Sequence, residues 1–168
     1  VLKQPNAYVS IAIARLSGEA VKLFEESGYC RENSTAYHRF NLQLHEKACK
    51  LIGRVMPPDH PDLVRLQAVC QRARGILPAL VRDDGTLPPL GDGAHGAVVA
   101  KSDPSALFRS AHLAVAKHGG SYLSLVCGHS QPFHKHLDDL SLTWHVRGHD
   151  ILIDGGSSNY DREDPVRQ

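Results

Sequence analysis

The first half of the chain repeats apolar residues every three or four positions, which is the spacing of one face of an α-helix. The pattern predicts a helix over Tyr8–Leu16. Ser17 would cap a second helix, which would stop at Gly28. Both helices would bury one apolar face against a neighbour.

Two longer helices are predicted downstream. The first follows the capping sequence Glu32-Asn33-Ser34 and ends near Gly53. The second opens at Pro61 and ends or kinks at Pro78. The expected core stripe of the first consists of Tyr37, Phe40, Leu44, Ala48, Leu51, Ile52 and Val55. That of the second consists of Leu63, Leu66, Val69, Cys70, Ala73, Ile76 and Leu77.

The pattern changes after a stretch rich in glycine, proline and aspartate over residues 82–104. Strands are expected over 111–116 and 121–126. A hairpin follows, in which Leu142 and Trp144 alternate with Thr143 and His145. This period of two predicts a strand whose apolar face is buried. After a turn at Arg147-Gly148-His149-Asp150, a short apolar strand ends at Asp154.

These elements predict an α+β chain with helices at 1–83, a linker at 84–104 and antiparallel strands at 105–168. Four helices and a few strands leave open apolar faces and sheet edges. We therefore expect the chain to be the seam of a larger two-domain protein, and to fold poorly or to associate when isolated.

Composition narrows the class of protein without identifying it. The chain has 168 residues, of which 42% are hydrophobic and 22% charged, as in an ordinary globular domain. Its net charge of +1 gives no reason to expect a nucleic-acid partner or a membrane surface. No apolar run is long enough to span a bilayer. The four cysteines form no CxxC pair and suggest no disulfide framework.

Two stretches carry candidate chemistry. In the first, His134, His136 and Asp138 alternate, so an extended backbone would place them on one face. Imidazole is a common zinc ligand, and Asp154 is a second candidate ligand at the end of a strand. The same histidines are equally consistent with partly exposed residues before a strand. His145 and His149 are expected to be solvated strand or turn residues.

The second stretch is ENSTAYHRF, residues 32–40. Tyr37 would lie in the first turn of its helix, where unpaired N–H groups and the helix dipole favour an anion. His38 and Arg39 add positive character there. This setting would lower the pKa of a phenol from about 10 and hold a carboxylated substrate. The alternative is that Tyr37 is the first core residue of the apolar stripe.

Taken together, GYCRENSTAYHRFNLQL, DDGTLPPLGDG and FHKHLDDLSLTWHVRGHDILIDGGSSNY resemble the heparinase II/III-like family of polysaccharide lyases. The resemblance implies part of an (α/α) toroid of helices followed by the first strands of a β-sandwich. It also implies β-elimination on uronic-acid-containing, glycosaminoglycan- or alginate-like polysaccharide, in a site between the two domains. Periplasmic or secreted proteins are typical of the family.

The resemblance assigns residues by their motif positions. Tyr37 matches the catalytic tyrosine and His134 the catalytic histidine, while His38 and Arg39 are candidate substrate-binding residues. His136 and Asp154 match two ligands of a structural zinc, whose third ligand would lie beyond Gln168. The residue that neutralises the substrate carboxylate would lie before Val1. Asp138 is a candidate to orient a histidine, and Tyr160 is a candidate site tyrosine.

The residue types fit the reaction. A uronate C5 proton is weakly acidic, so its carboxylate must be neutralised in the transition state. A base must remove the proton and an acid must protonate the leaving O4, and a tyrosine can do both when elimination is syn.

Two other functions remain open. HKHLDD is also similar to the HxHxDH motif of metallo-β-lactamase-like hydrolases, although a strand pattern follows it here where that fold has a helix. A non-catalytic carbohydrate-binding or polysaccharide-handling domain is the other alternative.

Overall fold

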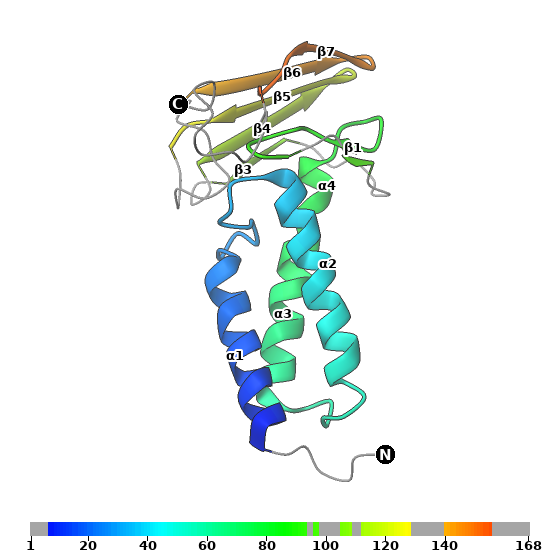
Figure 1. The fold of residues 1–168 in the computed structure, drawn as a ribbon. Helices are drawn as coiled ribbons and strands as arrows, with labels where there is room; N and C mark the ends of the chain where they lie inside the picture. Colours follow the sequence, from blue (N-terminus) through cyan, green and yellow to red (C-terminus); the bar gives the residue numbers. More distant parts are fainter. Residues whose placement is uncertain (1–6, 94–95, 98–104, 109–111, 129–139, 156–168) are drawn as a thin grey trace.

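The computed structural model describes residues 7–93, 96–97, 105–108, 112–128 and 140–155. The helices are α1 (Ala7–Leu23), α2 (Thr35–Ile52), α3 (Pro61–Gly75) and the single turn α4 (Leu77–Leu80). The three long helices stand side by side, and the strands lie across one end of them (Figure 1). The prediction of an α+β fold with helices followed by antiparallel strands is confirmed.

The strands form two antiparallel sheets. The small one pairs β1 (Thr86–Leu87) with β2 (Gly96–Ala97). The large one has the order β3-β4-β5-β6-β7, so every strand pairs with its neighbour in sequence. Its strands are Ala106–Phe108, Leu113–His118, Ser121–Val126, Ser141–Val146 and His149–Leu152.

The helix boundaries follow the predicted signals for α2 and α3 but not for α1, which ends at Leu23 and not at the predicted stop, Gly28. Ser34 caps α2, and Pro61 is the first residue of α3. The helical path breaks between Gly75 and Leu77, just before Pro78. The predicted break at Ser17 is wrong, because α1 runs through this fully buried residue without interruption and packs on α3. Tertiary packing overrides the weak preference of one serine for a helix start.

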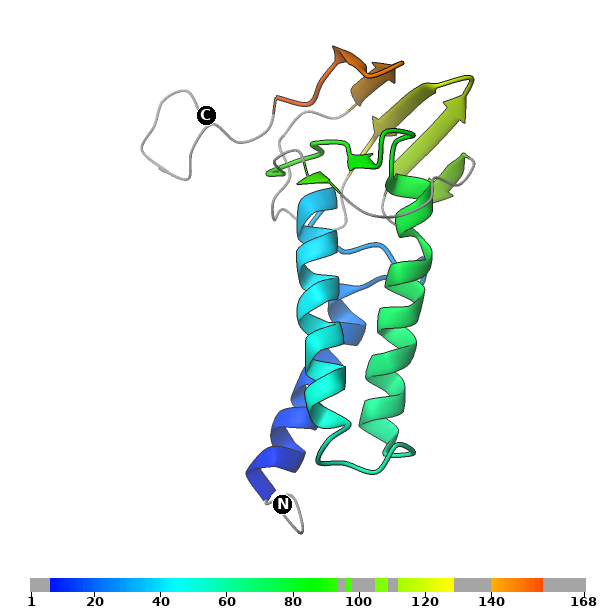
Figure 2. The same ribbon diagram turned by 90° about the vertical axis from the view of Figure 1, so that its right-hand side faces the viewer.

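The buried stripe of α3 is also as predicted, whereas that of α2 is not. Phe40 and Leu44 are about half exposed, at 53% and 48%. The buried side of α2 consists of Thr35, His38, Leu42, His45 and Ile52. Figure 2 shows α2 and α3 running alongside each other over their whole length. α2 therefore packs through a face that contains two histidines, and it leaves much of its apolar stripe in solvent.

Two clusters of buried side chains hold the chain together. The first lies among the three long helices and is centred on residues such as Phe24, Leu42 and Leu66. The second gathers residues from the loop after α1, the end of α4, the linker and strands β4 and β5, namely Tyr29, Leu80, Val81, Leu87, Leu90, Leu113, Val115 and Tyr122. Because it joins the helical end, the linker and the large sheet, this second core fixes the sheet on the helices.

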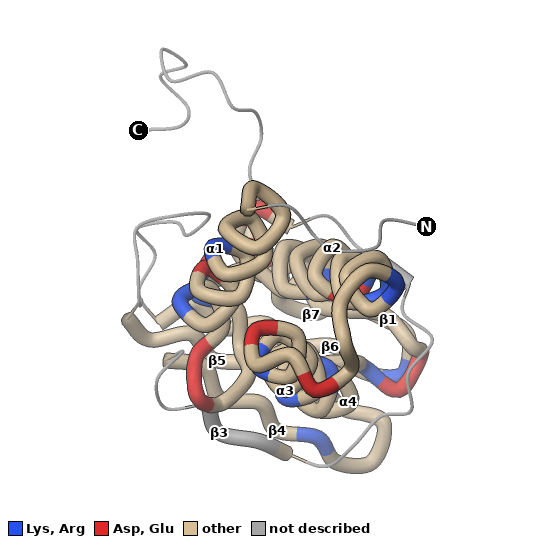
Figure 3. The backbone as a smooth tube through the Cα atoms, turned by 90° about the horizontal axis from the view of Figure 1, so that it is seen from below, with Lys and Arg blue, Asp and Glu red and all other residues tan. Residues whose placement is uncertain are grey.

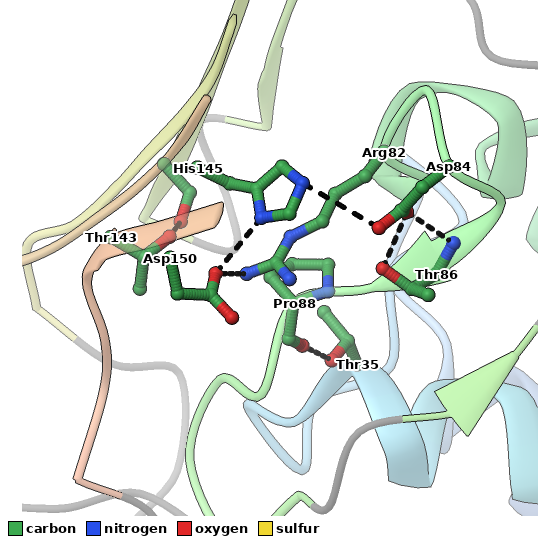
Figure 4. A network of polar contacts seen from close by, with 9 residues as sticks. Thr35, Arg82, Asp84, Thr86, Pro88, Thr143, His145 and Asp150 are labelled. Carbon is green, nitrogen blue, oxygen red and sulfur yellow. Dashed lines mark hydrogen bonds and ion pairs between the residues drawn. The ribbon is translucent and has the colours of Figure 1, made fainter. Parts of the chain in front are cut away.

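The inner face of β6 is polar, which reverses the predicted facing of this strand. Thr143 and His145 are buried, while Leu142 and Trp144 are 38% and 40% exposed. The polar face finds polar partners, as burial requires. Thr143 hydrogen-bonds to Ser124 on β5, and His145 lies in a network of charges (Figure 4). The expectation that His145 is solvated is therefore wrong, whereas His149 is exposed as expected.

The charge network joins the linker to the hairpin of β6 and β7. The Arg82 guanidinium, only 2% exposed, pairs with Asp150 at 2.8 Å. His145 places Nδ1 3.1 Å from the same carboxylate and Nε2 3.5 Å from Asp84. Arg82 also lies 5.8 Å from the centre of the Tyr122 ring. The carboxylate and the nearby aromatic face partly offset the cost of burying this guanidinium.

The turn between β6 and β7 brings Asp154 back toward β6. Arg147 and Gly148 both have positive φ, 47° and 87°, which is the backbone of a tight type I′ connection. The register shifts between Trp144 and His145, and Leu152 at the end of β7 pairs with Trp144. The chain then continues alongside the first half of β6. Asp154 consequently reaches Ser141.

Candidate functional site

The start of α2 is built by three consecutive polar residues. Asn33 adopts a left-handed backbone with φ of 56°, a conformation that asparagine tolerates. Ser34 caps the helix, and its Oγ accepts a hydrogen bond from the Tyr37 N–H at 3.4 Å. The Thr35 hydroxyl donates to the Pro88 carbonyl of the linker (Figure 4). Tyr37 therefore lies in the first turn of a helix whose start is fixed by the Ser34 cap and by the hydrogen bond from Thr35 to the linker.

The Tyr37 side chain is partly exposed. Its ring lies edge-on to the ring of Phe40, with centroids 6.4 Å apart. It is absent from the two buried cores. Tyr37 is therefore not part of the buried core, and its catalytic role stays a prediction.

His38 points to the opposite side of α2. It is fully buried, its Nδ1 accepts from the Cys30 N–H at 3.2 Å, and its Nε2 donates to the Ala73 carbonyl at 3.0 Å. Its ring stacks on Tyr29 with centroids 5.6 Å apart. Burial lowers the pKa of His38 to about 4. The predicted contact between His38 and substrate does not fit this position, because both ring nitrogens are bonded inside the protein.

Arg39 lies on the accessible side of the helix. It borders a hollow of about 180 Å³, together with Ala36, Phe40, Gln43 and Leu87. Within the part of the chain that the structure describes, its guanidinium forms no ion pair or hydrogen bond. Arg39 thus presents a guanidinium at the edge of an accessible hollow, and its role in substrate binding stays a prediction.

Asp154 is 7% exposed and lies against the linker. Its Oδ2 accepts from the Gly91 N–H and from the Ser141 hydroxyl, both at 3.3 Å. The same segment of linker crosses the start of α2, where a Cβ on Gly93 would come within 3.1 Å of Ser34 and Ala36. Residues 88–93 therefore join the first turn of α2 to the end of β7.

The remaining predicted site residues, His134 and His136 together with Asp138 and Tyr160, lie outside the described residues. Among the residues that are described, no three His, Cys, Asp or Glu side chains gather closely enough to hold a metal ion. Asp154 is the one proposed zinc ligand with a known position. Two hydrogen-bond donors orient its carboxylate, as commonly happens to metal-binding carboxylates.

The charges of the described residues do not gather into one single-sign patch. Viewed along the helices, lysines, arginines and acidic residues are interspersed around the bundle (Figure 3). Over the described part of the chain, no helix combines the length and apolar character needed to cross a bilayer.

The apolar pattern predicts Phe40 as a core residue and gives no signal for Gln43, although both border the hollow at Arg39. The outward position of these residues follows from the residues on the opposite, buried side of α2. His38, Leu42, His45 and Ile52 recur at helical spacing, and their burial turns Arg39, Phe40 and Gln43 outward. A histidine-containing stripe is not recognised by a search for apolar residues alone.

Comparison with known proteins gives matches at the level of structure. No protein-family profile matches the sequence, and no curated protein does. Among solved structures, a heparinase III, the BT4657 gene product, matches with a TM-score of 0.75 at 16% identity. A heparan sulfate lyase HepC mutant from Pedobacter heparinus matches with a TM-score of 0.74, also at 16% identity.

Each match covers 95% of this chain and 30% of the other chain. The chain thus spans under a third of the length of the structures that it resembles. The predicted resemblance is confirmed at the level of fold: this chain, over nearly its whole length, has the fold of one part of the heparinase III structures.

Proposed function

We propose that this protein, at its full length, is a polysaccharide lyase that cleaves uronic-acid-containing polysaccharide by β-elimination. The observation that carries the proposal is the fold shared with a heparinase III and a heparan sulfate lyase over 95% of the chain. The sequence motifs around Tyr37 and His134 agree with it.

In the proposed reaction, Tyr37 removes the C5 proton of the uronate or protonates the leaving O4, and His134 assists from the strand side. The position of Tyr37 supports this role, because it is partly exposed on the first turn of α2. The free N–H groups of a helix start stabilise negative charge that develops nearby. Arg39 would attract the acidic polymer.

We also propose a structural zinc bound by His136, Asp154 and one further ligand. The burial of the Asp154 carboxylate supports the proposal, since a bound cation would stabilise a negative charge at that position. Bound there, zinc would contribute to folding stability. Asp154 itself ties the sheet to the linker through Gly91.

The test is Tyr37→Phe in the full-length protein, with product formation followed by the ultraviolet absorbance of the unsaturated sugar. Phe keeps the ring and its contact with Phe40, so the melting temperature should hold while kcat falls by about 10² or more. Tyr8→Phe is the matched control, because Tyr8 is 82% exposed on α1 and should tolerate the change. His134→Ala should also lower kcat.

Equal activity of Tyr37→Phe and wild type would remove Tyr37 from the mechanism. Reducing ends without the absorbance would indicate hydrolysis and the metal-hydrolase alternative. Absence of product from every uronate polymer, with binding retained, would leave a carbohydrate-binding domain.

A further inference from the structure

The outward face of α2 holds a small hollow beside the proposed catalytic tyrosine. Ala36, Arg39, Phe40 and Gln43 follow the spacing of one helix face, and the buried Leu87 of β1 forms the remaining wall. The hollow has a volume of about 180 Å³, which is the scale of a single sugar ring rather than of a large cofactor.

The positive charge of Arg39 in this hollow has no ion-pair partner among the described residues. Arg74 pairs with Glu46 at 2.6 Å, and Arg82 pairs with Asp150 at 2.8 Å. Arg39, although partly buried, has no such partner there. A guanidinium offers a fork of donors that matches a carboxylate or sulfate group.

Phe40 contributes an aromatic surface in the same hollow. It is 53% exposed, whereas Phe24, the other phenylalanine of the helical region, is 2% exposed. An aromatic face packs well against the apolar C–H face of a pyranose ring. Gln43, one turn further along, is exposed and offers both a donor and an acceptor for hydroxyl groups.

We propose that Arg39, Phe40 and Gln43 form a subsite for one acidic sugar residue, in which Arg39 pairs with its carboxylate or sulfate, Phe40 packs on the ring and Gln43 bonds a hydroxyl. The edge-on contact between Phe40 and Tyr37, 6.4 Å between ring centroids, places this subsite next to the reaction centre. The inference rests on the proposed lyase function, and it adds determinants of binding that are separate from the proton-transfer residues.

The experiment measures binding without turnover, in the full-length Tyr37→Phe protein. The probes are a glucuronate-containing tetrasaccharide and a neutral glucose tetrasaccharide, titrated by calorimetry. Arg39→Gln should weaken binding of the acidic probe about tenfold or more, because a charge-assisted hydrogen bond is lost. Arg39→Lys should recover part of it, and Phe40→Ser should weaken binding by about three- to tenfold.

Two positions on the same helix provide matched controls. Lys50→Gln removes one positive charge from an exposed site, and Leu51→Ser removes an apolar side chain that is 52% exposed. Both lie at the far end of α2 and should leave the affinity for the acidic probe unchanged. The Arg39 effect should shrink as salt is raised, since partly exposed charges are screened.

The outcomes separate the subsite from the lyase proposal. If the wild type cleaves a uronate polymer but the Arg39 and Phe40 variants bind like the two controls, the subsite is wrong and the lyase stands. If no polymer is cleaved but binding depends on Arg39 and Phe40, the lyase is wrong and the subsite stands. Equal affinity for the acidic and neutral probes would overturn the role of Arg39.

Discussion

His38 is adjacent in sequence to the proposed catalytic tyrosine and faces the other side of α2. Both of its nitrogens are bonded to backbone groups of other segments, Cys30 and Ala73. It therefore connects α2 to α3 and to the loop after α1. Protonation would force the Nδ1 atom to give up the bond from Cys30, since an imidazolium has two donors and no acceptor.

The pH dependence of stability follows from this geometry. The pKa of His38 is about 4 in the folded protein, whereas an unfolded histidine has a pKa of about 6.5. The unfolded chain therefore binds the proton first as pH falls. The free energy of unfolding should be unaffected above about pH 6.5 and should drop between about pH 6.5 and 4, by up to about 3 kcal/mol.

His38→Gln should flatten this slope while lowering stability at pH 7.5, because one of the two buried hydrogen bonds is lost. Urea unfolding at pH 7.5 and pH 5 checks the expectation. His149→Gln is the control, since His149 is exposed and its removal should leave the slope as in wild type. A slope in His38→Gln equal to that of the wild type would contradict the assignment.

At the scale of elements, two glycines differ in whether the local backbone geometry requires a glycine. Gly28 has φ of +89°, and a Cβ there would lie 2.6 Å from the Arg72 carbonyl oxygen on α3. It lets the loop after α1 approach that helix closely. Gly18 lies inside α1, and a Cβ there would meet nothing within 4 Å. The first glycine is required by geometry, and the second only costs helix stability.

Alanine at the two positions should consequently change the free energy of unfolding in opposite directions. Gly28→Ala should destabilise the protein by about 2 kcal/mol or more, through backbone strain and a collision with backbone atoms. Gly18→Ala should stabilise it by up to about 1 kcal/mol. Chemical denaturation of the two variants in parallel is the measurement, and destabilisation of similar size in both would contradict it.

The elements were predictable where one physical signal acted alone. Proline at the start and an uninterrupted apolar stripe placed α3, and strict alternation placed β5 and the hairpin. The buried faces of α2 and β6 were not predictable in this way, because their inner residues are polar. His38, His45, Thr143 and His145 become buried only through partners that lie far away in sequence, such as Ala73 and Ser124.

The candidate site was predictable to a similar extent. Capping chemistry correctly placed Tyr37 in the first turn of α2. The positions of Arg39 and Phe40 around one hollow depend on which side of the helix is buried, and local sequence does not determine that. The link from Asp154 to Gly91 spans 63 residues, so it becomes visible only in three dimensions.

At the scale of the whole molecule, the zinc proposal gives different roles to His134, a proposed catalytic residue, and His136, a proposed zinc ligand. Metal analysis of the full-length protein should find zinc in the wild type and in His134→Ala, and little in His136→Ala. The melting temperature should fall in His136→Ala, because lost metal binding is lost folding free energy. Equal, negligible zinc in all three proteins would remove the metal.

The second core has a consequence for how the protein unfolds. Its residues come from the loop after α1, the end of α4, the linker and strands β4 and β5. Removing the sheet would expose Leu80, Val81 and Leu90, which are at most 1% exposed. The helical end and the sheet should therefore lose structure as one cooperative unit, even though the change in sequence pattern near residue 83 suggests two. Because Tyr29 of this core stacks on His38, a limited change in the sheet would then reach α2, the helix that carries Tyr37.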